Sequence, residues 1–182
     1  MIDPQTLISK ITKDKFGQLI KYLFTENHKP YYRYLENDTT NNYQNDKIRQ
    51  LKFYELTLMF YYYKNKMPVE YLNNIFSIEH ICPNSSIWVG ELNKDRIGNL
   101  IPIIHNENCK RGNKHIQVYT NKNHNFFRFI GDIIPVNNYT IYNKFIDHSY
   151  RKPHVHNNEA YNNFCDKNEN IYLNNFLHCL YK

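Results

Sequence analysis

The sequence predicts an α+β protein, with helices towards both ends of the chain and a strand, loop, strand and helix unit between them. Apolar residues recur at helical spacing over residues 7–24 and again over 47–64. In the middle of the chain, two short β-branched runs, FSIEHI and GNLIPIIH, have the composition of strands. We therefore divide the 182 residues into a helical part at 1–75, a central unit at 76–118 and a C-terminal part at 119–182 that packs on it.

The N-terminal part contains two predicted helices separated by a polar loop. The first extends from Leu7 to Phe24, with Asp3 and Pro4 as its cap and first turn. Residues 36–46 are polar and predict the loop, and KIRQLKFYELTLMFYYYK then forms a more apolar helix. A short helix begins near Pro68. The tyrosine clusters YYRY and FYYY are expected in the core, with stacking on nucleic-acid bases as the alternative.

The C-terminal part is a mixed aromatic and polar segment, a polar linker and a terminal helix. The linker is RKPHVHNNEA, and its two histidines have a spacing that zinc would accept on a strand. Because no Cys lies in this polar stretch, we predict a linker and not a metal site. The helix that follows carries regularly spaced apolar residues: Phe164, Leu173, Phe176, Leu177 and Leu180.

Charge and composition favour a polyanionic partner inside the cell. The formal net charge is +6 with a pI near 9.0, and each neutralised phosphate would release a condensed counterion. No stretch approaches the roughly 18 uninterrupted apolar residues of a membrane span, and the first residues lack a signal-peptide hydrophobic region. The cysteines form no CxxC pair, and this spacing predicts that they are free thiols. We expect a cytoplasmic protein with no membrane partner.

A carboxylate and an imidazole, Glu79 and His80, interrupt the first apolar strand just before Pro83. Hydrolysis of a phosphodiester needs an activated water, a cation beside the leaving oxygen and positive groups on the strand. An imidazole at residue 80 could activate the water. Glu79 and Asn108 could supply the oxygen ligands that a magnesium ion prefers. Because successive strand residues point to opposite faces, Glu79 and His80 can face one ion only where the strand is bulged or bent.

The segments EHICP, a following Trp, IGNLIPI and NCKRGNK together resemble the HNH (ββα-metal) nuclease motif. The pattern is most similar to the nuclease domain of GmrSD-type modification-dependent restriction enzymes and covers roughly residues 76–118. The resemblance implies that His80 is the general base and Glu79 a metal ligand. It implies that Asn99 holds the long loop by hydrogen bonds to its backbone, and that Asn108 is the last ligand, carried by a helix.

The implied activity is hydrolysis of DNA by one divalent metal ion, leaving a 5′-phosphate and a 3′-hydroxyl, in a restriction or defence setting. Mg²⁺ is the expected metal, with Mn²⁺ or another transition metal as alternatives, and His105 and His115 are alternative ligands. Contacts to nucleic acid are expected from five residues: Arg96, Lys110, Arg111, Asn113 and Lys114.

Two other functions stay open from the sequence. Asn occupies about one position in six, so the interpretation depends on the order and spacing of the whole set and not on any single Asn. The first alternative is a catalytically inactive nucleic-acid-binding module that keeps the hairpin as a scaffold. The second is a nuclease of the same type that acts on RNA. A nuclease of this size either forms a homodimer to cut both strands or nicks one strand, and a partner subunit that supplies targeting is a further alternative.

Overall fold

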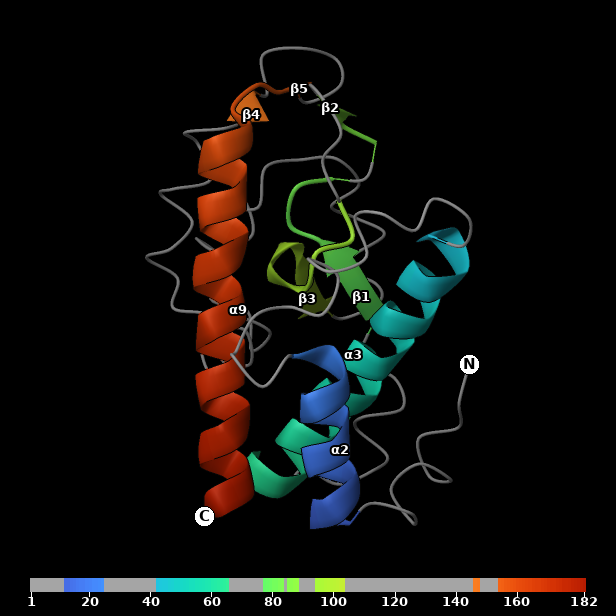
Figure 1. The fold of residues 1–182 in the computed structure, drawn as a ribbon, viewed down its shortest axis with the longest axis vertical. Helices are drawn as coiled ribbons and strands as arrows, with labels where there is room; N and C mark the ends of the chain where they lie inside the picture. The colour runs from blue at the N-terminus through green and yellow to red at the C-terminus, as the bar shows by residue number, and fades with distance from the viewer. Residues whose placement is uncertain are drawn as a thin grey trace.

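The computed structural model describes residues 12–24, 42–65, 77–83, 85–88, 94–103, 146–147 and 154–182. Within these ranges the predicted α+β class is confirmed (Figure 1). The helices are α2 (Lys13–Leu23), α3 (Asn42–Asn65), the short 3₁₀ helix η2 (Ile97–Asn99) and α9 (Asn158–Tyr181). The strands are β1 (Ser77–His80), β2 (Ile87–Trp88), β3 (Leu100–Ile103), β4 (Ile146–Asp147) and β5 (His154–Val155). The short helix near Pro68 and the helix predicted after β3 lie outside the described residues.

Helix α2 begins with a side-chain cap. The Thr12 hydroxyl oxygen accepts a hydrogen bond from the Lys15 amide at 3.1 Å, which satisfies one of the free N–H groups of the first turn. Asp14 in the first turn and Lys21 in the last turn both complement the helix dipole. The helical prediction is therefore confirmed over Lys13–Leu23, while the predicted cap at Asp3 and Pro4 lies outside the described residues.

Two helices begin earlier than the sequence predicted. Helix α3 begins at Asn42, inside the segment 36–46 that we predicted to be a loop. Helix α9 begins at Asn158, inside the predicted linker, and the Asn157 side chain accepts a hydrogen bond from the Ala160 amide at 3.0 Å. Both predictions were wrong because a first helical turn is often as polar as a loop, since Asn and Asp there satisfy the free N–H groups.

Aromatic side chains from three helices form the main core. The Phe176 ring of α9 packs edge-on against Phe16 of α2, at a centroid distance of 6.3 Å, and against Phe53 and Phe60 of α3, at 6.5 and 5.4 Å. All four side chains are buried. In the FYYY cluster, Phe60 and Tyr61 are buried as predicted, whereas the Tyr62 side chain is 36% exposed. The YYRY cluster lies outside the described residues.

Strands β1 and β3 form the antiparallel pair that the central block predicted. The register is continuous, and it pairs His80 with Leu100 and Ile78 with Pro102. Pro102 has no N–H to donate, which a strand tolerates at a sheet edge, and among the described residues β1 and β3 form a sheet of two strands. The two predicted strands are therefore present, whereas β2 lies within the segment predicted to be the loop between them.

A second, smaller sheet was not predicted. Its strand order is β2, β5, β4, with β5 parallel to β2 and antiparallel to β4. Strand β5 contains His154 and Val155, so the HVH segment is not a linker throughout. Two-residue strands leave almost no periodic pattern, which explains why the sequence did not reveal them.

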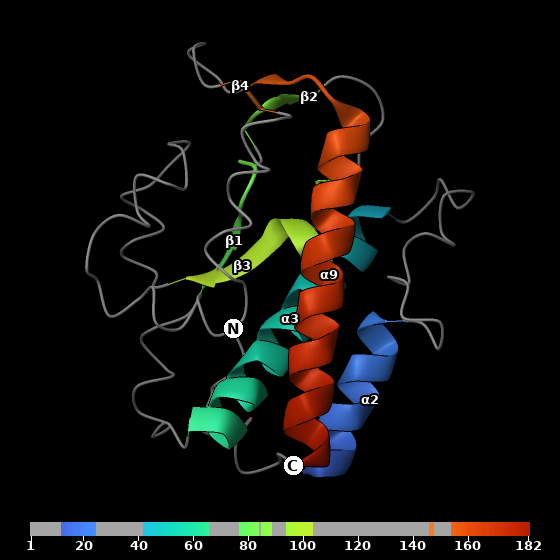
Figure 2. The same cartoon turned by 90° about the vertical axis from the view of Figure 1, so that its left-hand side faces the viewer.

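Helix α9 runs along the long axis of the molecule and joins its parts (Figures 1 and 2). One end of α9 lies at the small sheet, its middle passes the hairpin and η2, and its C-terminal half packs with α2 and α3. Among the described residues, no helix combines the length and apolar character needed to cross a membrane.

Candidate functional site

His80 lies at the end of β1 and contacts a carboxylate that the sequence did not single out. Its Nε2 atom lies 2.7 Å from Oδ1 of Asp95, in the segment that leads into η2. The same oxygen accepts a hydrogen bond from the Gln50 amide of α3 at 2.6 Å. The two side chains of the pair are 14% and 22% exposed, so solvent still reaches both.

The Asp95 carboxyl is held in its ionised form. Burial alone would raise its pKa, but the hydrogen bond and charge of His80, together with the positive charges of Lys94 and Arg49, outweigh this and lower the pKa below 3.8. An ionised carboxylate can only accept hydrogen bonds, so the His80 nitrogen facing it is the donor.

Asn99 connects the two ends of the loop between β1 and η2. Its side-chain oxygen accepts a hydrogen bond from the Cys82 amide at 2.7 Å, and its Nδ2 donates to the carbonyl oxygens of Lys94 at 2.8 Å and Cys82 at 3.3 Å. Its own carbonyl accepts from the Ile81 amide at 2.7 Å. Asn99 is fully buried. It therefore makes the loop-holding contacts that the motif implies, and it fixes the backbone directly after His80.

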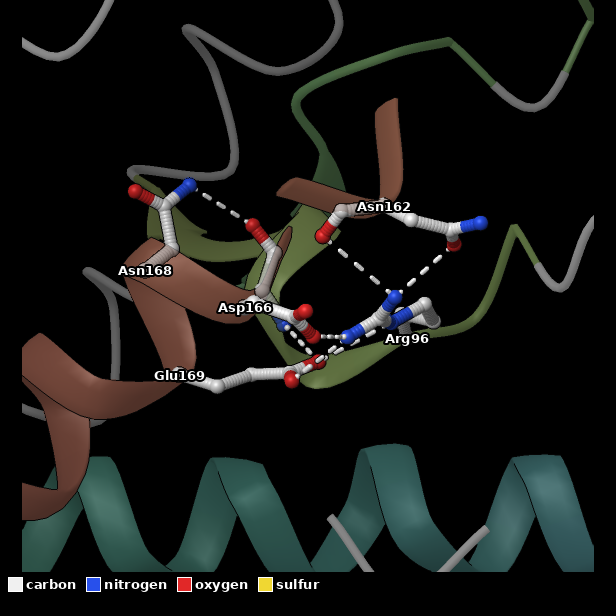
Figure 3. Close-up of polar contacts among 6 residues, drawn as sticks. Arg96, Asn162, Asp166, Asn168 and Glu169 are labelled. Carbon is white, nitrogen blue, oxygen red and sulfur yellow. Dashed lines mark hydrogen bonds and ion pairs between the residues drawn. The ribbon is translucent and has the colours of Figure 1, made fainter. Parts of the chain in front are cut away.

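Arg96 does not fit its predicted contact with nucleic acid, because it is buried and bound by carboxylates of α9. Figure 3 shows its guanidinium between Asn162, Asp166 and Glu169. The Arg96 Nε and Nη2 atoms donate to the two carboxylate oxygens of Glu169 at 3.2 and 2.8 Å. The Nη2 atom also contacts Asp166, and the Nη1 atom donates to Asn162 Oδ1 at 2.9 Å. Arg96 is 4% exposed. A cation enclosed in this way anchors a loop and is not available to a phosphate.

The polar face of α9 also binds the backbone of η2 and β3. Glu169 Oε1 accepts from the Gly98 amide at 3.1 Å, and Asn168 Nδ2 donates to the Gly98 carbonyl at 2.8 Å (Figure 3). The Tyr172 hydroxyl donates to the Leu100 carbonyl at 2.5 Å. Gly98 is needed here because a Cβ atom would lie 2.1 Å from the Cys165 carbonyl oxygen. The GNL segment of the motif is thus docked on α9.

Glu79 and His80 leave β1 on opposite faces. The β1–β3 register is continuous through both residues, so no bulge turns the two side chains to one side within this strand. Among the described residues, no group of three or more His, Cys, Asp or Glu side chains is arranged to hold a metal ion. A magnesium ion needs only one or two protein carboxylates, with water and substrate phosphate as its other ligands, so the partly buried Glu79 carboxylate fits the chemistry of one such ligand.

Several predicted site residues fall outside the described residues. These are Asn108, Lys110, Arg111, Asn113 and Lys114, together with the alternative ligands His105 and His115. The structure thus brings His80 and Asn99 together at the end of β1, whereas Glu79 leaves the strand on the opposite face. The metal and nucleic-acid assignments of the others stay predictions.

Sequence reasoning missed Asp95, Gln50 and the polar face of α9. The α9 face carried only a partial signal: Asn168 and Glu169 precede Tyr172 by about one helical turn, but their neighbours Lys167 and Asn170 are polar as well. Asp95 carried a weaker signal, as an acid placed three residues before GNL. Searches against protein-family models, curated proteins and solved structures found no match to this chain.

Proposed function

We propose that this protein is a metal-dependent endonuclease of the ββα-metal type that hydrolyses DNA. The observation that carries the proposal is the contact of His80 with Asp95 at the end of a two-stranded hairpin whose loop is held by Asn99. A solvent-accessible imidazole oriented by a carboxylate is an arrangement suited to general-base catalysis. The ordered motif from Glu79 to Lys114 supports the choice of a phosphodiester as substrate.

In this proposal His80 removes a proton from the attacking water, and the water oxygen attacks the phosphorus. The bond from phosphorus to the 3′-oxygen breaks, the 3′-oxygen takes a proton from solvent, and the products carry a 5′-phosphate and a 3′-hydroxyl. Asn99 acts on the backbone, because its hydrogen bonds to Cys82 and Lys94 keep the end of β1 close to Asp95.

The proposed cofactor is one divalent cation, with Mg²⁺ as the first choice. Asn108 would be one protein ligand. Glu79 leaves β1 on the face opposite His80, so it would be a second ligand only if metal binding bends the end of the strand. When bound, such an ion stabilises negative charge on the phosphate and on the leaving oxygen. Hard carboxylate and amide oxygens favour Mg²⁺ or Mn²⁺ over metals that prefer sulfur.

DNA would be held by positive groups that follow the hairpin. The formal charge of +6 favours a polyanionic partner, and the candidate contacts are Lys110, Arg111, Asn113 and Lys114. Arg96 is not among them, because α9 already binds its guanidinium. The setting we propose is restriction or defence against foreign DNA in the cytoplasm, with a second copy or a partner subunit to cut the opposite strand.

Nicking of supercoiled plasmid DNA in the presence of Mg²⁺ or Mn²⁺ tests the proposal. We expect His80→Ala to lower the nicking rate by about 10²–10⁴-fold, the contribution typical of a general base. His156→Ala is the matched control, because His156 is exposed ahead of α9 and lies outside the site. Circular dichroism of both variants checks that each is folded, and His80→Gln replaces His80→Ala if the latter does not fold.

The outcomes separate the candidate functions. Equal nicking by wild type and a folded His80 variant would exclude the His80 mechanism. If wild type cleaves neither DNA nor RNA but binds DNA with strong salt dependence, the protein is a binding module and not a nuclease. Cleavage of RNA alone would keep the chemistry and change the substrate.

A further inference from the structure

We infer that Asp95 is the positioning residue of His80, that it selects which imidazole nitrogen acts as the base, and that Gln50 holds it in place. This inference rests on the proposed nuclease function. It adds two residues, from the end of the loop and from α3, to a mechanism that otherwise uses the hairpin and the segment that follows it.

Two side chains contact the Asp95 carboxylate, and the residues on either side of Asp95 are held as well. Oδ1 contacts His80 Nε2 of β1 at 2.7 Å and the Gln50 Nε2 of α3 at 2.6 Å. The carbonyl of the preceding residue, Lys94, accepts from Asn99 at 2.8 Å. The following residue, Arg96, is bound by Glu169 of α9. Backbone and side chain of Asp95 are therefore both constrained, so the carboxylate can hold the imidazole in one orientation.

The contact determines the tautomer of His80. Since the lowered pKa keeps Asp95 ionised, its Oδ1 accepts a hydrogen bond and Nε2 of His80 carries the proton. In a neutral imidazole the lone pair is then on Nδ1. The proton from water therefore goes to Nδ1, and the positive charge that develops on the ring is stabilised by the carboxylate 2.7 Å from Nε2.

Gln50 determines which oxygen of the Asp95 carboxylate faces His80. Its amide N–H binds the same Oδ1 that faces His80, which keeps that oxygen directed between α3 and β1. A side chain that orients the partner of a catalytic group is expected to affect the rate without contacting the substrate.

Single-turnover nicking of plasmid DNA with Mg²⁺ tests the catalytic part of the inference. We expect Asp95→Ala to lower the nicking rate about 10–100-fold with unchanged DNA affinity, since the loss affects orientation and not binding. Gln50→Ala should give a smaller loss in the same direction. Asp14→Asn is the matched control, because it removes one carboxylate from an exposed position on α2. A general loss of structure would instead lower the rate and DNA affinity together.

Nitrogen-15 NMR of the histidines, without DNA or metal, tests the positioning part. At alkaline pH, where imidazoles are neutral, wild-type His80 should show the Nε2–H tautomer, and Asp95→Ala should show a mixture of both tautomers. His80→Gln assigns the signal by its absence. Asp95→Leu serves if Asp95→Ala does not fold, because it likewise removes the acceptor that faces His80 and fills more of the space.

The two measurements separate this inference from the proposed function. If a folded Asp95→Ala variant nicks DNA with the same single-turnover rate as wild type, the inference is overturned and the proposed nuclease function stands. An Nδ1–H tautomer in the wild type would also overturn it. If wild type cleaves no nucleic acid, the proposed function fails, and the tautomer of His80 still decides whether Asp95 orients the ring.

Discussion

Asp95 and Arg96 are adjacent residues of opposite charge that attach the same short segment to different elements. Asp95 contacts β1 and α3, whereas Arg96 contacts α9 through Glu169 and Asp166. Taking the Arg96 guanidinium out of water is costly, and the bidentate contact with Glu169 compensates for part of that cost. Removing one partner of such a buried pair typically costs about 3–5 kcal/mol. The position of Asp95, and with it that of His80, therefore depends on a residue of the C-terminal helix.

The contact of Asp95 with His80 predicts a loss of stability in acid. Because the pKa of Asp95 is lower in the folded state than in the unfolded state, the ionised carboxylate stabilises the fold at pH values above the unfolded pKa. This stabilisation is lost as pH falls through the folded pKa, which lies below 3.8. We expect Asp95→Asn to be less stable than wild type by about 1–2 kcal/mol at neutral pH. That difference should disappear at the acid end, where the protonated Asp95 resembles Asn. Urea unfolding at a series of pH values measures it.

The control for this prediction is the exposed carboxylate of Asp14. Its replacement by Asn should change the free energy of unfolding by about 0.5 kcal/mol or less at neutral pH, as surface substitutions usually do. A difference between Asp95→Asn and wild type that stays constant down to strongly acid pH would contradict the contribution of an ionised Asp95.

The sequence indicated the site residues that belong to an ordered motif and missed those that do not. His80, Glu79 and Asn99 were found because their spacing along one segment is characteristic. Glu169 was missed because its partner Arg96 is 73 residues away, and a charged residue on a helix is usually predicted to face solvent. Arg96 was assigned to nucleic acid for the same reason. Pairing between distant charges leaves no periodic signal, so only the fold reveals it.

At the scale of elements, η2 lies against α9 so closely that the backbones touch. A Cβ atom at Gly98 would lie 2.1 Å from the carbonyl oxygen and 2.5 Å from the Cα atom of Cys165. These are backbone atoms of a long helix, which cannot rotate away as a side chain can. The close approach is what allows Asn168 and Glu169 to bind both polar groups of the Gly98 backbone.

Alanine substitutions at two glycines should have opposite effects on stability. Gly98→Ala should lower the free energy of unfolding by about 3 kcal/mol or more, because η2 has to move away from α9 and lose its hydrogen bonds. Gly17→Ala should raise it by about 0.5–1 kcal/mol, because Gly17 is inside α2 and its new Cβ would be 3.5 Å from the Leu180 side chain, an ordinary contact. Urea unfolding of both variants measures these shifts. Equal effects would contradict the docking of η2 on α9.

Element boundaries were predicted least well, and for a common reason. The apolar positions of α2, α3 and α9 predicted that these helices exist, but the starts of α3 at Asn42 and α9 at Asn158 lie in polar segments rich in Asn. These residues favour both loops and helix N-termini, so composition alone does not separate the two. The two-residue strands β2, β4 and β5 are too short for any alternation to be recognised.

At the scale of the molecule, α9 serves two kinds of packing along one helix. Its C-terminal half contributes Phe176 to the aromatic core with α2 and α3. Its N-terminal half contributes the polar contacts of Asn162, Asn168 and Glu169 to the segment that carries Asp95. Because both halves belong to one continuous helix, the candidate site is fixed relative to the core that stabilises the protein. This arrangement holds the imidazole and its carboxylate in a fixed relative position, although the sheets among the described residues are small.

The net charge of +6 bears on DNA binding through the salt dependence of affinity. Each phosphate neutralised by the protein contributes about −0.9 to the slope of log affinity against log salt concentration. If the three candidate cations Lys110, Arg111 and Lys114 each neutralise one phosphate, we expect a slope of about −2.7, which corresponds to a roughly 40-fold loss of affinity when salt rises fourfold. Fluorescence anisotropy of a labelled duplex across a salt series, without divalent metal, measures the slope.

Single substitutions then distinguish specific phosphate contacts from the effect of overall charge. Arg111→Gln should reduce the magnitude of the slope by about 0.9, because one fewer counterion is released. Lys21→Gln removes the same charge from an exposed position on α2 and should leave the slope unchanged, since it lies outside the candidate contacts. Equal slopes for both variants would mean that the cations after the hairpin do not contact the phosphates. The positive charge would then act only over long range, by an attraction that salt screens as a whole and that does not depend on which lysine or arginine is removed.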